Sequence, residues 1–215
     1  MSGVENNAVR VPWEEWPRLD VYRFFQPLEQ PIFGVTFTLD VTRLHAYTHA
    51  RGLSFYYALV YLCTEAINSV EAFHYCERSD GLYRLERRIP SFTDLKPGAE
   101  QFHIVTIDHG DDLDAFCRRA RRESLEQTCF IRAEAESDAL LYLSCLPWLP
   151  LTHLTNERGA DRTDAIPRLA WGRYEAHNGR LTLGMSVEVN HRFVDGLHIG
   201  RFYESLCAQI AALEP

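Results

Sequence analysis

The C-terminal third of the chain contains the pattern that most restricts its fold, an alternating strand followed by an amphipathic helix. In residues 181–189 (LTLGMSVEV) every second residue is apolar, which predicts a β-strand with one buried face. After Gly196, apolar residues recur along one helical stripe: Ile199, Phe202, Leu206, Ile210 and Leu213. We therefore expect a sheet with a helix packed against its apolar face.

Shorter apolar segments elsewhere predict a mixture of strands and helices without a repeating β-α unit. Strands are predicted at residues 32–40, 82–86, 102–107 and 139–146. Helices are predicted at residues 16–25, 54–70 and 111–127. This order indicates an α/β protein of the α+β type, in which a mixed sheet packs against helices as a two-layer sandwich.

Nothing in the sequence divides the chain into several domains. No period of about 20 to 50 residues recurs, and no Gly/Ser-rich or Pro-rich linker interrupts the chain. At 215 residues, one domain can bury most of the apolar surface of the unfolded chain. We expect a loose N-terminal segment over residues 1–15 and a single domain over residues 16–215.

Charge and hydropathy restrict the partners and the location. The 30 Asp and Glu residues against 22 Lys and Arg residues give a net charge of -8, which argues against nucleic acid or an anionic membrane as a partner. No apolar stretch approaches the roughly 20 residues that span a bilayer, and the N-terminus is not built like a signal peptide. We expect a cytoplasmic protein that binds neither nucleic acid nor membranes.

Motifs for metals and nucleotide cofactors are weak in this sequence. The six cysteines form no C-x-x-C pair, so neither a disulfide framework nor a zinc site is expected. His45 and His49 have the spacing that can hold a metal on a helix, but no third ligand lies nearby in the sequence. No phosphate-binding loop, dinucleotide fingerprint or nucleophile elbow is present. We therefore expect no bound metal.

The segment that joins the alternating strand to the last helix, residues 190–196 (NHRFVDG), is the most informative polar stretch. Strand parity directs His191 toward the buried face, and an imidazole held at a strand end can accept a proton near neutral pH. Asp195 precedes Gly196, where a tight turn could fold it back to fix the loop or orient a cation. On spacing alone, the pattern is more typical of a structural histidine than of a catalytic one.

Two separated motifs resemble those of the chloramphenicol acetyltransferase family. Residues 190–198 (NHRFVDGLH) resemble the family's His-His-x-x-x-Asp-Gly-Phe-His, and residues 144–148 (SCLPW) resemble its Ser-x-x-Pro-Trp. Residues 190–192 also resemble the Asp-His-Arg of dihydrolipoyl acyltransferase catalytic domains, which share the fold. Three shorter stretches add to the resemblance: Trp16-Pro17-Arg18, Ser54-Phe55-Tyr56 and residues 90–93. The resemblance covers the chain from about Trp16 to about Leu206.

This resemblance implies the CoA-dependent acyltransferase fold and an acetyl-CoA-dependent O-acetyltransferase for chloramphenicol or a similar small hydroxyl compound, an activity associated with antibiotic resistance. It also implies a homotrimer with active sites at subunit interfaces and a reaction without an acyl-enzyme. His191 would be the general base, and Ser144 would donate a hydrogen bond to the tetrahedral oxyanion. Asp195 and Arg18 would form a salt bridge that keeps the imidazole oriented.

The same resemblance implies the residues that bind the two substrates. Those near acetyl-CoA, which is the co-substrate, would be Arg173, Tyr174 and Trp148. Those that line the acceptor pocket would be Phe24, Phe25, Thr93, Phe102 and Phe130. From the residues alone, Ser144 is more typical of a small core residue on a buried strand, and Trp148 is compatible with simple packing.

Several positions depart from the family pattern and leave other functions open. Ala170 stands where the family usually has a threonine near the reacting centre, and Ser54 stands where a lysine often helps to bind CoA. Arg192 is a bulky cation where a small residue is usual, and Glu29 and His103 favour a more polar acceptor. The alternatives are an acyltransferase for a different acceptor, such as a natural-product alcohol or amine, and a catalytically silent trimeric small-molecule-binding protein.

Overall fold

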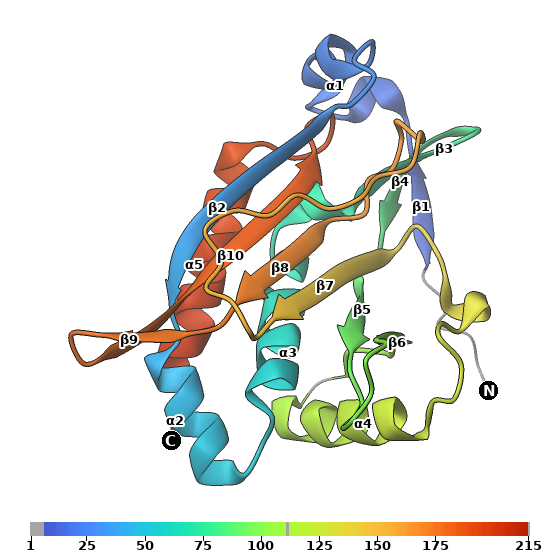
Figure 1. Cartoon of the computed structure of the whole chain (residues 1–215). Coiled ribbons are helices and arrows are strands. Elements are labelled where there is room, and N and C mark those ends of the chain that lie inside the picture. Colours follow the sequence, from blue (N-terminus) through green and yellow to red (C-terminus); the bar gives the residue numbers. More distant parts are fainter. Residues whose placement is uncertain (1–6, 111, 215) are drawn as a thin grey trace.

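The computed structural model describes residues 7–110 and 112–214, which form two β-sheets (Figure 1). The larger, seven-stranded sheet has the order β2-β10-β8-β7-β5-β6, with β9 paired to β10. Its strands are β2 (Ile32–Asp40), β5 (Ile89–Asp94), β6 (His103–Thr106), β7 (Leu140–Leu146), β8 (Arg168–Gly172), β9 (Glu175–His177) and β10 (Arg180–Asn190). β7 runs parallel to β5 and β8, and the other neighbouring strands are antiparallel.

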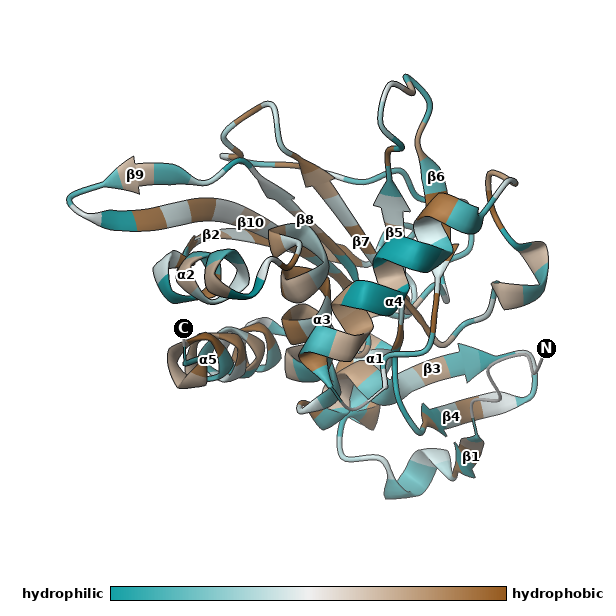
Figure 2. Ribbon diagram, turned by 90° about the horizontal axis from the view of Figure 1, so that it is seen from below, coloured by the Kyte–Doolittle hydropathy of each residue, from teal (hydrophilic) through white to brown (hydrophobic). Residues whose placement is uncertain are grey.

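A small sheet and the helices complete the fold. The small sheet has the order β1-β4-β3 and consists of β1 (Ala8–Val11), β3 (Tyr75–Arg78) and β4 (Gly81–Leu85). The α-helices are α1 (Leu19–Phe25), α2 (Thr42–Arg51), α3 (Phe55–Asn68), α4 (Leu113–Glu126) and α5 (Gly196–Ala212). The 3-10 helices are η1 (Trp13–Glu15), η2 (Glu71–His74) and η3 (Ala133–Ala135). Helices α2, α3, α4 and α5 lie on one face of the large sheet (Figure 2), which confirms the expected mixed sheet packed against helices.

The two helices with the clearest apolar patterns form where the sequence predicts them. Ser54 caps α3 by accepting a hydrogen bond from the backbone N–H of Tyr57 at 3.4 Å. Most of α3 is buried, since it contacts both α4 and α5 as well as the sheet. In α5 the predicted stripe faces this core, with Ile199, Phe202, Leu206 and Ile210 buried. Long apolar patterns therefore determined the helical layer.

Strand β10 is buried on both faces over its C-terminal half. The apolar residues of the predicted alternation face the helices: Leu183, Met185, Val187 and Val189 are all buried. On the other face Ser186, Glu188 and Asn190 are buried as well. The cause is a segment, residues 147–167, that crosses this face of the sheet and that the alternation alone did not indicate.

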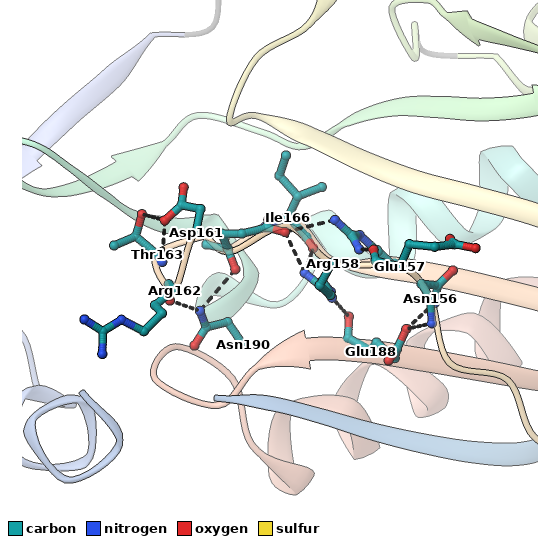
Figure 3. A network of polar contacts seen from close by, with 12 residues as sticks. Asn156, Glu157, Arg158, Asp161, Arg162, Thr163, Ile166, Glu188 and Asn190 are labelled. Atoms are coloured by element: carbon teal, nitrogen blue, oxygen red, sulfur yellow. Dashed lines mark hydrogen bonds and ion pairs between the residues drawn. The ribbon is translucent and has the colours of Figure 1, made fainter. Parts of the chain in front are cut away.

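The crossing segment is held by hydrogen bonds to the polar side chains of β10. Figure 3 shows Asn156 beside Glu188, whose Oε2 accepts a hydrogen bond from the Asn156 backbone N–H at 2.7 Å. The Ser186 hydroxyl donates to the carbonyl of Leu154 at 3.0 Å. Gly184 makes the close approach possible, because a Cβ at this position would overlap the segment's backbone at Leu151.

The N-terminal region differs from the expectation of a loose segment over residues 1–15. Strand β1 pairs with β4, with Ala8 opposite Leu85 and Val11 opposite Leu82, and η1 follows it directly. Residues 8–15 are therefore ordered against the rest of the chain. Residues 1–6 lie outside the described part of the structure.

Two elements near the site were not predicted, for different physical reasons. Helix α2 buries only Leu44 and Thr48, so its sequence shows little apolar periodicity. Strand β5 contains Pro90, which the sequence suggested as a turn former. The Pro90 carbonyl accepts from the Ile107 N–H at 3.4 Å, on the side where the pairing with β6 ends. Because the N–H and C=O of one residue point to the same side of a strand, the missing N–H of proline removes no bond to β7.

Candidate active site

His191 lies directly after β10, between two aromatic rings. Its backbone N–H donates to the carbonyl of Pro31 at 2.7 Å, which fixes the turn beside β2. The ring of Phe25, the last residue of α1, stacks on the imidazole with centroids 4.1 Å apart. The ring of Phe33, on β2, stacks on it at 4.6 Å. Because both rings are nearly parallel to the imidazole at these distances, they occupy its two faces.

The surroundings of His191 favour a neutral imidazole. Partial burial lowers the pKa of His191 and the charge of Arg18 acts in the same direction, while the charge of Asp195 partly offsets them. Within the described residues, no group forms a hydrogen bond with either ring nitrogen of His191. A neutral ring with a free lone pair is the form that can accept a proton at neutral pH.

The predicted supporting pair, Arg18 and Asp195, is in contact beside this histidine. Arg18 Nη1 lies 2.7 Å from Asp195 Oδ2, and both side chains are mostly buried. Asp195 also caps α5, because its Oδ1 accepts from the Leu197 N–H at 3.1 Å and its own N–H donates to His198 Nδ1. Burial acts to raise the pKa of Asp195, but the hydrogen bond from Arg18 and the neighbouring positive charges outweigh it and lower the pKa. The loop from His191 to α5 is thus held by an ionised carboxylate.

Ser144 lies on β7, on the face of the large sheet opposite the helices. Its hydroxyl is 3.0 Å from the hydroxyl of Thr93 on β5, and either group can be the donor. In the register of the sheet Ser144 is paired with Ala170 on β8. Its side chain is only partly buried, so it is not a residue of the helical core. A partly exposed hydroxyl of this kind can donate a hydrogen bond to a bound group.

His191 and Ser144 are far apart within one chain. The register pairs Ser144 with Ala170 and Ala170 with Ser186, so these three residues share one level of the sheet. His191 lies five residues beyond Ser186, which at roughly 3.4 Å per residue is about 17 Å further along the strand direction. The structure therefore does not bring the two predicted catalytic side chains together in a single protomer.

The predicted cofactor-binding residues lie at the end of the sheet near Ser144. Because β7 and β8 are parallel, both strands end on the same side of the sheet. Trp148 follows the end of β7, and Arg173 and Tyr174 follow the end of β8. Trp148 is 66% exposed. The Tyr174 ring contacts Phe55 at 5.2 Å and His45 at 5.3 Å. The Arg173 guanidinium is half exposed, 3.8 Å from Glu175.

The predicted acceptor residues fall into two separate groups. Phe24 and Phe25 lie at the end of α1, with their rings 5.0 Å apart and Phe25 against His191. Thr93 lies beside Ser144, near the end of β5. The rings of Phe102 and Phe130 are 5.4 Å apart and a little under half exposed where β6 begins, opposite the end of β5.

These groups define two half-sites at opposite ends of the strands of the large sheet. The histidine half-site consists of Arg18, Phe24, Phe25, Phe33, His191 and Asp195. The serine half-site consists of Thr93, Phe102, Phe130, Ser144, Trp148, Arg173 and Tyr174. Each half-site contains part of the predicted machinery, and neither contains all of it.

The structure adds one aromatic residue to the site, and the described residues hold no metal ligand set. Phe33 was not predicted at the site, although its position opposite Val189 in the register places it next to His191. The rings of His45 and His49 lie 6.2 Å apart. Across the described residues, no group of three or more His, Cys, Asp or Glu side chains could hold a metal ion. Nor does any described helix have the length and apolar character needed to cross a membrane.

The fold and the histidine loop place the chain in the class of CoA-dependent acyltransferase folds. A solved chloramphenicol acetyltransferase superposes with a TM-score of 0.84 at 20% identity, covering 95% of this chain and all of that chain. The cubic core of the pyruvate dehydrogenase multienzyme complex superposes with a TM-score of 0.68 at 18% identity, covering 90% of this chain and 86% of that chain. These likenesses confirm the fold that the sequence motifs implied.

The family model of chloramphenicol acetyltransferase matches residues 6–207, and the chain belongs to this family of acyltransferases. Chloramphenicol acetyltransferase 3 of Escherichia coli is 24% identical over 204 residues, which are 93% of this chain and 95% of that protein. The chloramphenicol acetyltransferase of Clostridium perfringens is 25% identical over 194 residues, covering 88% of this chain and 89% of that protein. The relative from Bacillus pumilus is 22% identical over 196 residues, covering 90% and 89%.

Proposed function

We propose that this protein is an acetyl-CoA-dependent O-acetyltransferase that acts on chloramphenicol or a similar small hydroxyl compound. The observation that carries the proposal is the state of His191, whose imidazole is stacked between two phenyl rings and has a lowered pKa, with neither ring nitrogen hydrogen-bonded to any described residue. The ring is thus held in place while its nitrogens can still accept a proton.

In the proposed reaction His191 is the general base. A nitrogen of its ring accepts the proton of the acceptor hydroxyl while the hydroxyl oxygen attacks the thioester carbonyl of acetyl-CoA. The tetrahedral oxyanion receives a hydrogen bond from Ser144, and its collapse breaks the C–S bond. The CoA thiolate then takes the proton from the imidazolium, so the base is restored and no acyl-enzyme forms. General base catalysis contributes about 10²- to 10⁴-fold, and the positioning of two substrates contributes much of the rest.

The assembly we propose is a homotrimer whose active sites lie at subunit interfaces. Its support is the separation of the two half-sites within one chain, because a base about 17 Å from the oxyanion donor cannot act with it in the same protomer. If the histidine half-site of one subunit faces the serine half-site of the next, a cyclic arrangement completes every site.

The serine half-site is suited to bind acetyl-CoA as the co-substrate. Trp148 and Tyr174 offer exposed aromatic surface for a purine ring, and the Arg173 guanidinium can pair with a phosphate group. Ser54 supplies no positive charge there, because its hydroxyl is neutral. This hydroxyl serves as the N-cap of α3. Because acetyl-CoA is a metabolite of the cytoplasm, we place the enzyme there, where acetylation of chloramphenicol would confer resistance to this antibiotic.

The acceptor is the part of the proposal with a competing candidate, an acyltransferase for another alcohol or amine. One of the two residues that favoured a polar acceptor does not face the site. The His103 ring is buried and lies 3.0 Å from the Ser124 hydroxyl on α4, so it belongs to the helical layer. Four of the five predicted acceptor residues are aromatic, Thr93 being the exception, and such a surface suits a nitrophenyl ring.

The test is release of the CoA thiol from acetyl-CoA in the presence of chloramphenicol and of a panel of other small alcohols and amines. Release with chloramphenicol supports the first candidate, and release only with another acceptor supports the second. If no acceptor in the panel gives release while chloramphenicol still binds, the chain is the silent binding protein instead.

The role of the base is tested with His191→Ala against the control His177→Ala, which changes an exposed histidine on β9. We expect turnover to fall by about 10²-fold or more in the first variant and to stay unchanged in the second, with the same oligomeric state in both. A fully active His191→Ala enzyme would refute the mechanism.

A further inference from the structure

Arg192 is a buried cation that directly follows the proposed base, and its side chain contacts α1 and β3. It is 3% exposed, although the corresponding family position usually holds a small residue. Its Nη2 donates to the carbonyl of Gln26 at 2.7 Å, and its Nη1 lies 3.7 Å from Glu77 Oε2 on β3. The guanidinium also lies 5.8 Å from the ring centroid of Tyr22. A buried charge of this kind needs such partners, so its contacts define a specific structure.

The contact with Gln26 fixes the end of α1. Gln26 is the C-cap residue of this helix, and the last carbonyls of a helix have no partner within it. A guanidinium at this end satisfies one of these carbonyls and interacts favourably with the helix dipole. Phe25, which precedes Gln26, is the residue that stacks on His191 at 4.1 Å. Arg192, the residue directly after the base, is therefore linked through Gln26 to Phe25, whose ring covers the base.

Asn190, the residue before the base, is anchored to the crossing segment, whereas Arg192 is anchored to α1. The Asn190 side chain donates to the carbonyls of Arg162 and Asp164 at 3.0 and 3.1 Å (Figure 3). Its Oδ1 accepts from the Arg192 backbone N–H at 3.1 Å. His191 thus lies between one residue tied to the crossing segment and another tied to α1. The Phe25 ring lies on the Arg192 side, at the end of α1 that Arg192 contacts through Gln26.

From these contacts we propose that Arg192 is a positioning residue, which holds the end of α1 so that Phe25 covers one face of the His191 imidazole. The proposal rests on the proposed function, in which His191 is the base. Arg192 does not touch the substrates and acts only through Gln26 and Phe25. The charged groups that act on the imidazole itself are Asp195 and Arg18, which pair with each other and not with Arg192.

The test compares Arg192→Met and Arg192→Lys with a matched control, Arg23→Met, which removes an exposed arginine of α1. We expect kcat of Arg192→Met to fall about 10- to 100-fold, with KM for acetyl-CoA unchanged, because the base is misplaced while the serine half-site is intact. The acid limb of kcat/KM should move to higher pH, since the uncovered imidazole is hydrated. Arg192→Lys retains a donor for Gln26 and should recover most of the rate, and Arg23→Met should match the wild type.

Two results would overturn the proposal. One is an Arg192→Met enzyme with unchanged kcat and acid limb at the same oligomeric state, and the other is a loss of kcat without movement of the acid limb, which indicates a purely structural role. The proposed function fails separately, if His191→Ala remains active. An inactive His191→Ala together with an unaffected Arg192→Met would remove this inference alone.

A double-mutant cycle of Arg192→Met with Phe25→Leu tests the route, and it can be run with Arg192→Gln, which also removes the charge, if Arg192→Met does not fold. When two residues act through the same contact, their effects are not additive. We expect the double variant to lose no more than about threefold beyond the more damaging single variant. Losses that multiply would show that Arg192 does not act through Phe25, which contradicts the proposal.

Discussion

An interface site predicts that two inactive variants restore each other's activity. His191→Ala destroys the histidine half-site and leaves the serine half-site intact, while Ser144→Ala does the reverse. Loss of one oxyanion donor lowers kcat by about 10²- to 10³-fold, so each variant alone gives a low background. In a mixed trimer, an interface is intact when it takes its histidine from a Ser144→Ala chain and its serine from a His191→Ala chain.

The expected recovery follows from counting interfaces. With equal amounts of both chains and random assembly, about one interface in four of all trimers receives two intact residues. Every trimer that contains both chains has one such interface among its three, so the isolated mixed oligomers should regain about a third of wild-type activity. The assay is thiol release by mixed oligomers isolated through two different affinity tags. The control is a mixture of the two separately purified variants without subunit exchange. Mixed oligomers as inactive as their parents would refute the reasoning from strand register.

Two further predictions concern a charge beside His191 and a buried charge outside the site. In Asp195→Asn the helix cap is retained but the negative charge that raises the pKa of His191 is lost, so the acid limb of kcat/KM should move to lower pH, as a pH–rate profile measures. Arg88 is fully buried and donates to five backbone carbonyls, those of Phe73, Tyr75, Asp138, Leu140 and Ala165. Arg88→Met should therefore reduce stability by about 3–5 kcal/mol and lower Tm by roughly 10 °C in thermal unfolding, whereas Arg78→Met, at an exposed ion pair, should have little effect.

The sequence was sufficient for elements whose own residues determine their structure. The stripe of α5 and the apolar run of α3 are buried as expected, because a helix with such a face must pack against something. The sequence was insufficient for features whose structure depends on a distant segment of the chain. The burial of Glu188 depends on the crossing segment, residues 147–167, which lies over this face of the sheet. Pro90 fits into strand β5 because its nitrogen points to the side on which the pairing with β6 has already ended.

The site shows the same division between local and distant causes. His191 and Asp195 could be selected from one motif, but Arg18 lies 177 residues from its partner Asp195 and was identified only through the resemblance to a family. The contact of Arg192 with Gln26 spans 166 residues and could not be found from sequence at all. Such pairs are determined by where α1 packs, which no single segment specifies.

The two half-sites differ in a way that suits a reaction between two substrates at an interface. On the histidine side, the residues flanking the base are buried and tied by hydrogen bonds to α1 and to the crossing segment, so the imidazole is in position before any substrate binds. On the serine side, Trp148 is largely exposed in one chain, and Phe102 and Phe130 are nearly half exposed. Exposed aromatic groups of this size mark surfaces that a ligand or another subunit covers. A rigid base on one subunit and an open aromatic surface on the next would let substrates enter without disturbing the group that takes the proton.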